Sequence, residues 1–395
     1  MDKGILNNIR VLDFTRVLAG PYATRILGDF GAEVIKVQSK ESSTGAEDNR
    51  SAYFHTWNRN KRSITLNMGH AEGREIARRL VALSTVVIEN YSPRVMTNWG
   101  LDYESLRGIK KDIIMVSMSG MGRTGPWRDY VAFGPTIQSL CGLTFLSSGS
   151  KDNPTGPGYS YADVVAGLYG ALAVLAALVY RDRTGLGQFI DLSEYEAACT
   201  LLGPFFMDQV ANQREILPMG NRSPHITACP HGCYPCLGKD RWCVIGVFED
   251  PEWKALRQVI GDPSWAKNGR LSTISGRKKY EDEVDGHLRE WTITRRAEEI
   301  VQRLQDANVP SAVVQNAEDL AHDPQLLARR YFREIRHPTS GVIRTDTGPI
   351  KWRSGEKGPW KPSPLRGENN QYVFHELLGL PEDMIRTYKE KGIIR

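Results

Sequence analysis

A regular alternation of short apolar segments and helical patterns over residues 9–117 constrains the fold more than any other feature of this chain. The expected strands are 10–14, 32–37, 85–89 and 113–117, and the expected helices are 22–30, 70–83 and 102–108. A strand–helix–strand unit places its two strands in parallel, joined by a right-handed crossover. We therefore predict an α/β fold with a Rossmann-like, doubly wound parallel sheet.

The pattern changes after about residue 215, which indicates a second, smaller domain. The predicted parts are a large Rossmann-like domain over 1–221, a small α+β domain over 222–325, and a C-terminal segment over 326–395 that returns to the large domain. The small domain carries short β-like pieces over 228–248 and helical patterns at 251–260, 277–290 and 294–307. Residues 336–366 are rich in Pro, Gly and Trp, and we expect a long loop there.

The composition is that of a globular protein, with 41% hydrophobic and 25% charged residues in 395. Six cysteines are too few for a disulfide framework, and no basic stretch followed by an apolar one opens the chain. A cytoplasmic location is therefore expected. The net charge of +5 is spread along the chain without runs, and no nucleic-acid-binding motif occurs, so no nucleic-acid partner is expected.

The longest uncharged apolar run, residues 164–180, follows directly after Asp163. Its 17 residues are at the lower limit for a membrane span, and Gly167 and Gly170 interrupt it, so we expect a buried core helix and no membrane. An Asp in this position is typical of a helix N-cap, and the positive end of the helix dipole favours its ionised form. Asp163 is thus either a plain helix cap or an ionised carboxylate available as a nucleophile.

Short motifs follow one another along nearly the whole chain. They are 11–21, 27–37, 58–64, 89–93, 100–101, 119–126, 161–167, 220–222, 232–236, 240–242, 367–369 and 376–380. In this order they resemble the class III CoA-transferases (CaiB/BaiF-like), a family that includes formyl-CoA transferases and alpha-methylacyl-CoA racemases. The resemblance implies an interlocked homodimer, in which two chains thread through each other.

By this resemblance, Asp163 attacks an acyl-CoA thioester to form an acyl anhydride, and then carries CoA as an aspartyl-CoA thioester. A carboxylate suits this role because its anhydride keeps the bond energy of the thioester, provided that water is excluded. CoA is a substrate here, and neither a tightly bound cofactor nor a metal is expected. The residues that the resemblance places on CoA are Arg16, Val17, Leu18 and Ala19 along the pantetheine and Lys61, Arg62, Asn90 and Tyr91 at the nucleotide, with Arg94, Arg123 and Lys36 as further candidates.

Two departures from the family pattern narrow the function. Racemases of the family pair the Asp with a His, but no His occurs between His70 and His225, and two-base proton transfer needs a second group that titrates near neutrality. Formyl-CoA transferases carry a run of glycines where this chain has 218–222. Arg94 also stands where the family usually has Gly.

We therefore predict a CoA-transferase, a transferase of sulfur-containing groups, that moves CoA from an acyl-CoA to a carboxylic acid. The alternatives are an acyl-CoA isomerase or racemase of the same family, and a non-catalytic acyl-CoA-binding protein. The candidate residues that face the acid are Trp127, Phe133, Gln138, Tyr159 and Tyr161, whose aromatic character suggests a bulky or aromatic acid, although the same residues could belong to the core.

Two further motifs need an interpretation. Gly120, Gly122 and Gly125 have dinucleotide-like spacing, but Pro126 follows at once, so we expect a loop that passes close to Asp163 rather than the start of a long helix. The cysteines at 229, 233 and 236 have the spacing of a radical-SAM iron–sulfur site, but prolines interrupt them, and we interpret the spacing as incidental.

Overall fold

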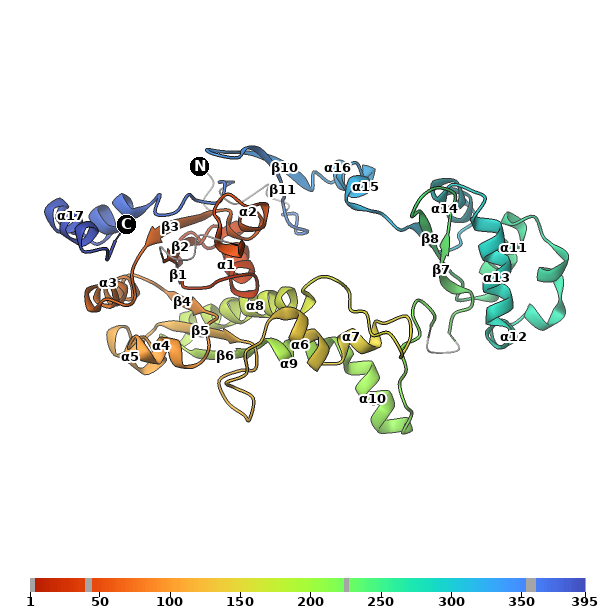
Figure 1. Cartoon of the computed structure of the whole chain (residues 1–395), viewed down its shortest axis with the longest axis horizontal. Coiled ribbons are helices and arrows are strands. Elements are labelled where there is room, and N and C mark those ends of the chain that lie inside the picture. Colours follow the sequence, from red (N-terminus) through yellow and green to blue (C-terminus); the bar gives the residue numbers. More distant parts are fainter. Residues whose placement is uncertain (1–3, 40–44, 224–226, 353–359, 395) are drawn as a thin grey trace. The chain divides into compact units, whose positions relative to one another are not determined.

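The structure is a computed structural model that describes residues 4–39, 45–223, 227–352 and 360–394 (Figure 1). The chain divides into two compact units. The first consists of residues 1–144, 156–215 and 330–395, and the second of residues 145–155 and 216–329. The predicted small domain falls within the second unit, which begins six residues earlier and also takes in the separate segment 145–155.

The first unit is built on a six-stranded sheet in the order β3-β2-β1-β4-β5-β6, with every neighbouring pair parallel. The strands are β1 (Arg10–Asp13), β2 (Glu33–Gln38), β3 (Lys61–Thr65), β4 (Val86–Glu89), β5 (Ile114–Ser119) and β6 (Phe189–Ser193). The order reverses between β1 and β4, as in a doubly wound dinucleotide-binding fold. The predicted sheet is confirmed, and β3 and β6 add two strands that the sequence did not predict.

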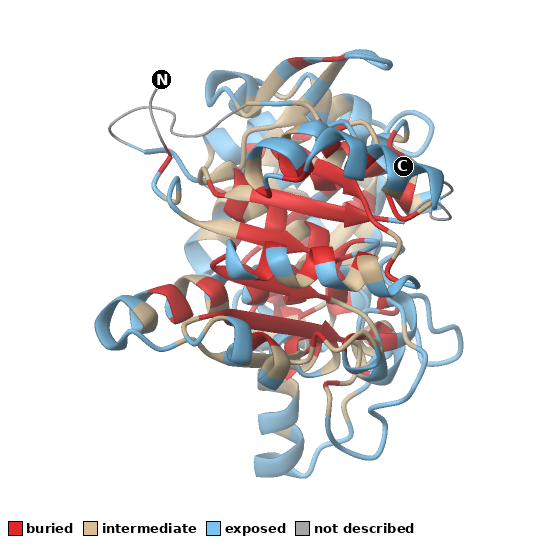
Figure 2. Cartoon of the chain, turned by 90° about the vertical axis from the view of Figure 1, so that its left-hand side faces the viewer, coloured by how far each residue is buried: buried red, intermediate tan, exposed pale blue. Residues whose placement is uncertain are grey.

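Helices cover both faces of this sheet, and alternate strand residues point to each layer. One face packs α3 (Ala71–Ala82), α5 (Tyr103–Ile109) and the C-terminal π-helix (Gln371–Leu377) and α17 (Glu382–Glu390). The other packs α1 (Ala19–Asp29), α8 (Tyr161–Thr184) and α9 (Glu194–Cys199). Figure 2 shows the buried strands between helices whose outer surfaces are exposed.

Shorter elements complete the first unit. They are η1 (Gly45–Glu47), α2 (Ala52–Asn58), α4 (Arg94–Asn98), α6 (Gly134–Leu140), η2 (Thr200–Leu202) and α10 (Gly203–Asn212). Helix α7 (Leu143–Leu146) spans the boundary between the units. Among the described residues, α8 alone is long and apolar enough to cross a membrane by length and composition, and half of that stretch is buried inside the protein.

The long loop predicted for residues 336–366 is wrong in its first part. Strands β10 (Phe332–His337) and β11 (Gly341–Asp346) form an antiparallel hairpin there. Arg59, only 1% exposed, holds the hairpin by binding both Asp29 and Asp346. The hairpin escaped prediction because β10 carries charged residues at three of its six positions, and only Ile335 and His337 of that strand are buried.

The C-terminal segment covers the outer edge of β3. The Asn369 side chain accepts a hydrogen bond from the Ser63 backbone N–H (2.9 Å), and the Asn370 side chain accepts one from the Thr65 N–H (3.0 Å). The Asn369 N–H donates in turn to the Ser63 carbonyl (2.9 Å). Backbone groups that an edge strand would otherwise present to solvent are thereby paired.

The second unit combines a three-stranded antiparallel sheet with helices. Its strands are β7 (His231–Pro235), β8 (Trp242–Gly246) and β9 (Ser311–Val313), and its helices include α11 (Asp250–Val259), α12 (Ile274–Lys279), α13 (Glu281–Thr292), α14 (Ala297–Asp306), α15 (Ala317–Ala321) and α16 (Pro324–Ala328), with 3-10 turns at Ser264–Lys267 and Gly269–Leu271. Cys229 and Cys236 are buried in this unit. Within the described residues, no group of three or more His, Cys, Asp and Glu side chains could hold a metal ion.

Candidate functional site

The carboxyl ends of β1 and β4 form the point at which the strand order of the sheet reverses. In doubly wound sheets ligands bind in the crevice outside this point. The loops after the two strands are tied together here: the Arg16 N–H donates to Asn90 Oδ1 (2.7 Å), and Asn90 Nδ2 donates to the Arg16 carbonyl (2.8 Å). The structure thus brings the predicted residues Arg16 and Asn90 into direct contact.

Val17, the next residue of this loop, has a left-handed backbone conformation with φ of 66°. Such a conformation is strained for a β-branched residue and is held by its surroundings. The Val17 N–H donates to Glu47 Oε1 (3.1 Å), and Glu47 pairs with the fully buried Lys36 (3.5 Å). Lys36 therefore stabilises the Val17 loop from inside the protein, through Glu47, and is not an exposed cation that a phosphate could reach.

Lys61 is also an interior residue. Its ammonium donates to the Pro21 carbonyl (3.0 Å) and to Asn58 Oδ1 (3.0 Å), and forms an ion pair with Asp13 Oδ2 (3.1 Å). Although burial alone would raise the pKa of Asp13, the nearby lysines hold that pKa below its usual value. All three N–H groups of Lys61 are used, so a phosphate could bind there only by displacing one of these partners.

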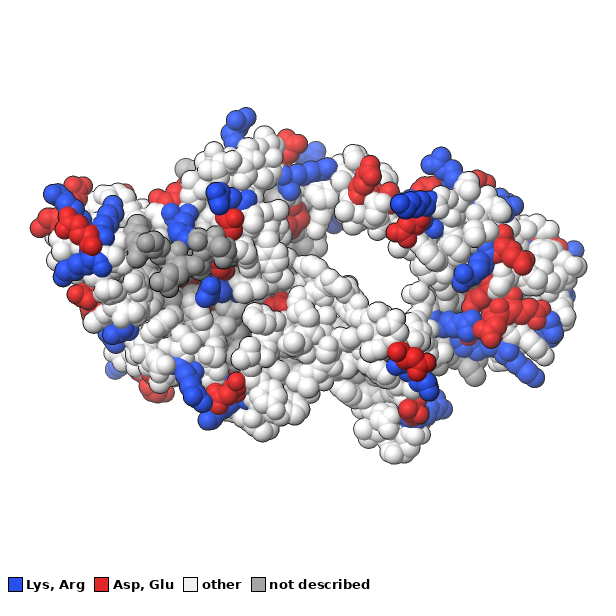
Figure 3. All heavy atoms as spheres, in the orientation of Figure 1, with Lys and Arg blue, Asp and Glu red and all other residues white. Residues whose placement is uncertain are grey.

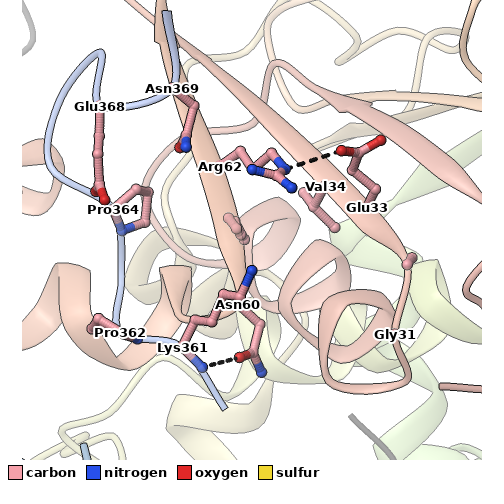
Figure 4. Close-up of a pocket in the computed structure, with 12 residues that line it drawn as sticks. Gly31, Glu33, Val34, Asn60, Arg62, Lys361, Pro362, Pro364, Glu368 and Asn369 are labelled. Carbon is pink, nitrogen blue, oxygen red and sulfur yellow. Dashed lines mark hydrogen bonds and ion pairs between the residues drawn. The ribbon is translucent and has the colours of Figure 1, made fainter. Parts of the chain in front are cut away.

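Arg62 points to the opposite face of β3, because successive side chains of a strand alternate. It binds Glu33 (3.0 Å) and lies over the Tyr372 ring, 4.0 Å from its centroid. Arg62 and Glu33 line a cavity of about 320 Å³ at the amino ends of β2 and β3 (Figure 4). Asn90 and Tyr91 follow the carboxyl end of β4, so the structure does not bring the four residues predicted at the nucleotide together.

The remaining basic candidates differ in exposure. Arg94 is 75% exposed and pairs with Asp129 (3.2 Å). Arg123 is largely buried and binds the Pro93 carbonyl (2.7 Å) and Glu89 (3.6 Å). Burial raises the pKa of Glu89 to about 6, against the opposing effect of its hydrogen bonds. Arg123 therefore stabilises the loop after β4.

Asp163 is the third residue of α8 and not its N-cap, because the helix begins at Tyr161. Gln138 of α6 takes the capping role, since its side-chain oxygen accepts from the Tyr161 N–H. The Asp163 carboxyl accepts a hydrogen bond from the Ser160 hydroxyl and lies near the Ala19 backbone N–H, and the residue is only 8% exposed. Burial raises the pKa of Asp163 above its usual value, although the Ser160 hydroxyl and nearby backbone N–H groups oppose this. The start of α1 thus lies near the predicted nucleophile.

Gly134, the first residue of α6, lies against this carboxyl. A Cβ atom built at Gly134 would come within 2.0 Å of Asp163 Oδ2 and 1.5 Å of Ser160 Oγ, so only glycine fits. The glycines expected near Asp163 lie elsewhere: a Cβ at Gly120 would meet Ala132, and one at Gly122 would meet Ser193. The connection after β5 reaches Asp163 only at Gly134, where the loop has ended and α6 starts.

Aromatic side chains cluster near the Asp163 carboxyl, and of these only Tyr159 was singled out from the sequence. Tyr53 of α2 is 38% exposed, and burial together with the charge of Asp163 raises its pKa to about 12. Burial also raises the pKa of Tyr159, with further contributions from Tyr22 and Asp163. The Trp57 ring packs against the rings of Tyr22 and Tyr53, with centroid distances of 5.2 Å and 6.2 Å. The result is an aromatic wall made of Tyr22, Tyr53, Trp57 and Tyr159.

Comparison with known proteins shows the family of the chain. A probable CoA-transferase of Mycobacterium tuberculosis is 32% identical over 95% of this chain, which spans 48% of that relative. The succinyl-CoA–D-citramalate CoA-transferase of Chloroflexus aurantiacus is 30% identical over 98% of each chain. The crystal structure of a CaiB/BaiF family protein from Brucella suis superposes with a TM-score of 0.87, at 30% identity, over 95% of this chain and all of that one. Residues 6–370 match the profile of CoA-transferase family III, and the chain belongs to this family.

Proposed function

We propose that this protein transfers CoA from an acyl-CoA thioester to a carboxylic acid, with Asp163 as the covalent nucleophile. The observation that carries the proposal is the buried Asp163 carboxyl at the switch-point edge of the sheet. No cation among the described residues pairs with it, so its charge remains available. Burial raises its pKa, and a more basic carboxylate is a better nucleophile.

The reaction proceeds by four exchanges at carbonyl carbons. An Asp163 oxygen attacks the thioester carbon, the C–S bond breaks, and the CoA thiolate leaves with the electron pair. The thiolate then attacks the Asp163 carbonyl of the mixed anhydride and releases the first acid as its carboxylate. An incoming carboxylate attacks the aspartyl-CoA thioester and frees the thiolate. The thiolate finally attacks the new acyl carbon, which regenerates the Asp163 carboxylate.

Two features of the site support these steps. The Ser160 hydroxyl donates to the Asp163 carboxyl and the Ala19 N–H lies near it, and such fixed donors can stabilise the charge that develops on its oxygens. The aromatic wall and the low exposure of Asp163 limit the access of water, which would hydrolyse an anhydride.

The same geometry supports a site for CoA. The loop Arg16–Ala19 and the loop residues Asn90 and Tyr91 flank the crevice beside Asp163, which suits the pantetheine arm. Arg16 is an exposed cation in the first of these loops, and Arg94 is an exposed cation three residues after Tyr91. These two residues are our candidates for the CoA phosphates. Lys36, Lys61 and Arg123 would act indirectly, by holding the loops.

A panel of CoA donors and acids tests this function. We expect the purified protein to form a new CoA thioester from succinyl-CoA or acetyl-CoA and at least one of a set of aliphatic, aromatic and dicarboxylic acids, measured by mass spectrometry of the CoA products. Succinyl-CoA is the first donor to use, because it is the donor in the name of the Chloroflexus relative. Absence of exchange with every pair, and of any acyl or CoA adduct on the protein, would refute a transferase.

We also propose that the protein pairs with a second copy of this chain through the outer side of α8 and α10. Large apolar side chains are exposed there: Leu168, Tyr169, Leu172, Val179, Tyr180, Phe206, Met207 and Val210. Figure 3 shows few charged residues over α6–α9 on the visible face. A surface of this kind is typical of a protein interface.

The expected result is a solution mass of twice 44.3 kDa by analytical ultracentrifugation. Leu172→Glu, at a residue that is 61% exposed, should shift the protein towards the monomer, because it places a charge in the apolar surface. Leu83→Glu, on the opposite face of the sheet, is the matched control. A monomer at tens of micromolar would contradict the proposal.

A further inference from the structure

A second carboxyl group is buried beside the proposed nucleophile. Glu194 is the first residue of α9, directly after β6 ends, and is 6% exposed. Among the residues that the structure describes, none donates a hydrogen bond to its carboxyl group or forms an ion pair with it. A buried acid without a partner is unusual, because an ionised carboxylate is costly to bury.

The backbone around Glu194 is fixed. The Ser193 hydroxyl accepts from the Glu196 N–H (3.2 Å) and caps α9, while the Tyr195 N–H donates to the Gly120 carbonyl (2.9 Å). Helix α9 packs against both α8 and α6. Glu194 therefore cannot leave the interior without unseating the start of this helix.

The two carboxyl groups have different surroundings. Asp163 of α8 receives a hydrogen bond from Ser160 and lies near the Ala19 N–H, and both favour its charged form, whereas Glu194 receives no hydrogen bond. Helix α6, which packs on both, carries no titratable residue. Burial, and after it the charge of Asp163, raises the pKa of Glu194 to about 8. Two nearby acids in such unequal environments take different protonation states.

We propose that Glu194, buried next to the transferase site, remains a neutral carboxylic acid while Asp163 is ionised, so that loss of its proton switches exchange off at alkaline pH. The proposal rests on the CoA-transferase function proposed above. The site must admit a negatively charged carboxylate substrate next to the charge of Asp163. A further negative charge in the same interior would oppose that entry and disturb the nucleophile.

The test is the pH dependence of kcat/KM for exchange, from pH 6 to about pH 10, in the wild type and in Glu194→Gln. The wild-type rate should fall about tenfold per pH unit above about pH 8, as expected for one deprotonation. Gln is neutral at every pH and similar in shape, so Glu194→Gln should keep the neutral-pH rate and lose the alkaline decline. Carboxylic acid substrates are fully ionised over this range and cannot produce the decline.

Glu196→Gln is the matched control, since Glu196 lies on the same helix and is exposed. It should behave as the wild type does. The proposal fails if Glu194→Gln keeps the alkaline decline, or if the folded variant loses exchange at pH 7. In the latter case Glu194 would take part in the chemistry itself.

Infrared difference spectroscopy tests the protonation of Glu194 even if no exchange is found. A protonated carboxyl band should persist near pH 7 in the wild type and be absent in Glu194→Gln. In Asp163→Asn the band should be lost at a lower pH, because the charge that helps to keep the proton is gone. If the wild type shows no protonated carboxyl band at pH 7, the inference about Glu194 alone is wrong. A lack of exchange would instead overturn the transferase function.

Discussion

Asp163→Asn should lower the rate of CoA exchange by roughly 10⁴-fold or more, the scale of loss when an acyl-transfer enzyme loses its nucleophile. An amide cannot form the anhydride, yet it is nearly isosteric with the carboxylate and can still accept a hydrogen bond from Ser160. The fold and acyl-CoA binding should therefore persist. The measurements are the formation of the new CoA thioester and the intact mass of the protein, which should show acyl or CoA adducts on the wild type only.

Asp182→Asn is the matched control, because Asp182 is an exposed acid in the last turns of the same helix. It should exchange CoA at the wild-type rate. Retention of exchange by Asp163→Asn would remove Asp163 from the mechanism. Loss of exchange in Asp163→Asn, together with unchanged acyl-CoA affinity, would separate a transferase from a protein that only binds acyl-CoA.

Gly134→Ala should abolish most exchange while the protein remains folded. The new methyl group would occupy space within 2.0 Å of Asp163 Oδ2 and 1.5 Å of Ser160 Oγ, so both side chains must move. A displacement of about 1 Å at a reacting group can cost on the order of 100-fold in rate. We expect a loss of at least about this size in kcat, measured in the same exchange assay, with circular dichroism as the test of folding.

Gly108→Ala provides the control, since Gly108 lies in helix α5 with no atom near the position of a Cβ. Alanine favours helices, so this variant should be active and slightly more stable than the wild type. Wild-type exchange in Gly134→Ala would show that the close approach of α6 to Asp163 has no role in catalysis.

The alternation of strands and helices was readable because the strands of a parallel sheet are apolar on both faces. β3 lacks this signal, since it begins with Lys61, Arg62 and Ser63. It is a buried strand only because Lys61 finds Asp13, Asn58 and the Pro21 carbonyl inside the fold. Partners that lie up to 48 residues away in the chain cannot be inferred from a local pattern.

The same strand shows why the predicted CoA residues did not assemble as a group. Lys61 and Arg62 are neighbours in sequence, but on a strand they point to opposite faces, one towards α1 and the other towards Tyr372. Asn90 and Arg16, by contrast, are far apart in the chain and hydrogen-bonded in space. The switch point of the sheet brings them together, and its position requires the strand order.

Asp163 itself was found by resemblance, whereas its surroundings came from the structure. Glu194 has the appearance of an ordinary acid in the first turn of a helix, where such residues are usually exposed. Gly134 and Tyr53 belong to no pattern that marks them. Their roles follow from how closely α2, α6 and α9 approach the start of α8, which is a property of packing.

The contacts of Asn369 and Asn370 with β3 also bear on how the chain is made. Thr65 and Asn370 are separated by 305 residues, and a ribosome adds about 5–20 residues each second. The segment that pairs with the outer edge of β3 is therefore synthesised roughly 15–60 s after β3 itself. During that interval its outer backbone groups are open to other nascent chains. Synthesis that stops before residue 369 would leave the edge permanently unpaired, and the truncated product would be prone to aggregation.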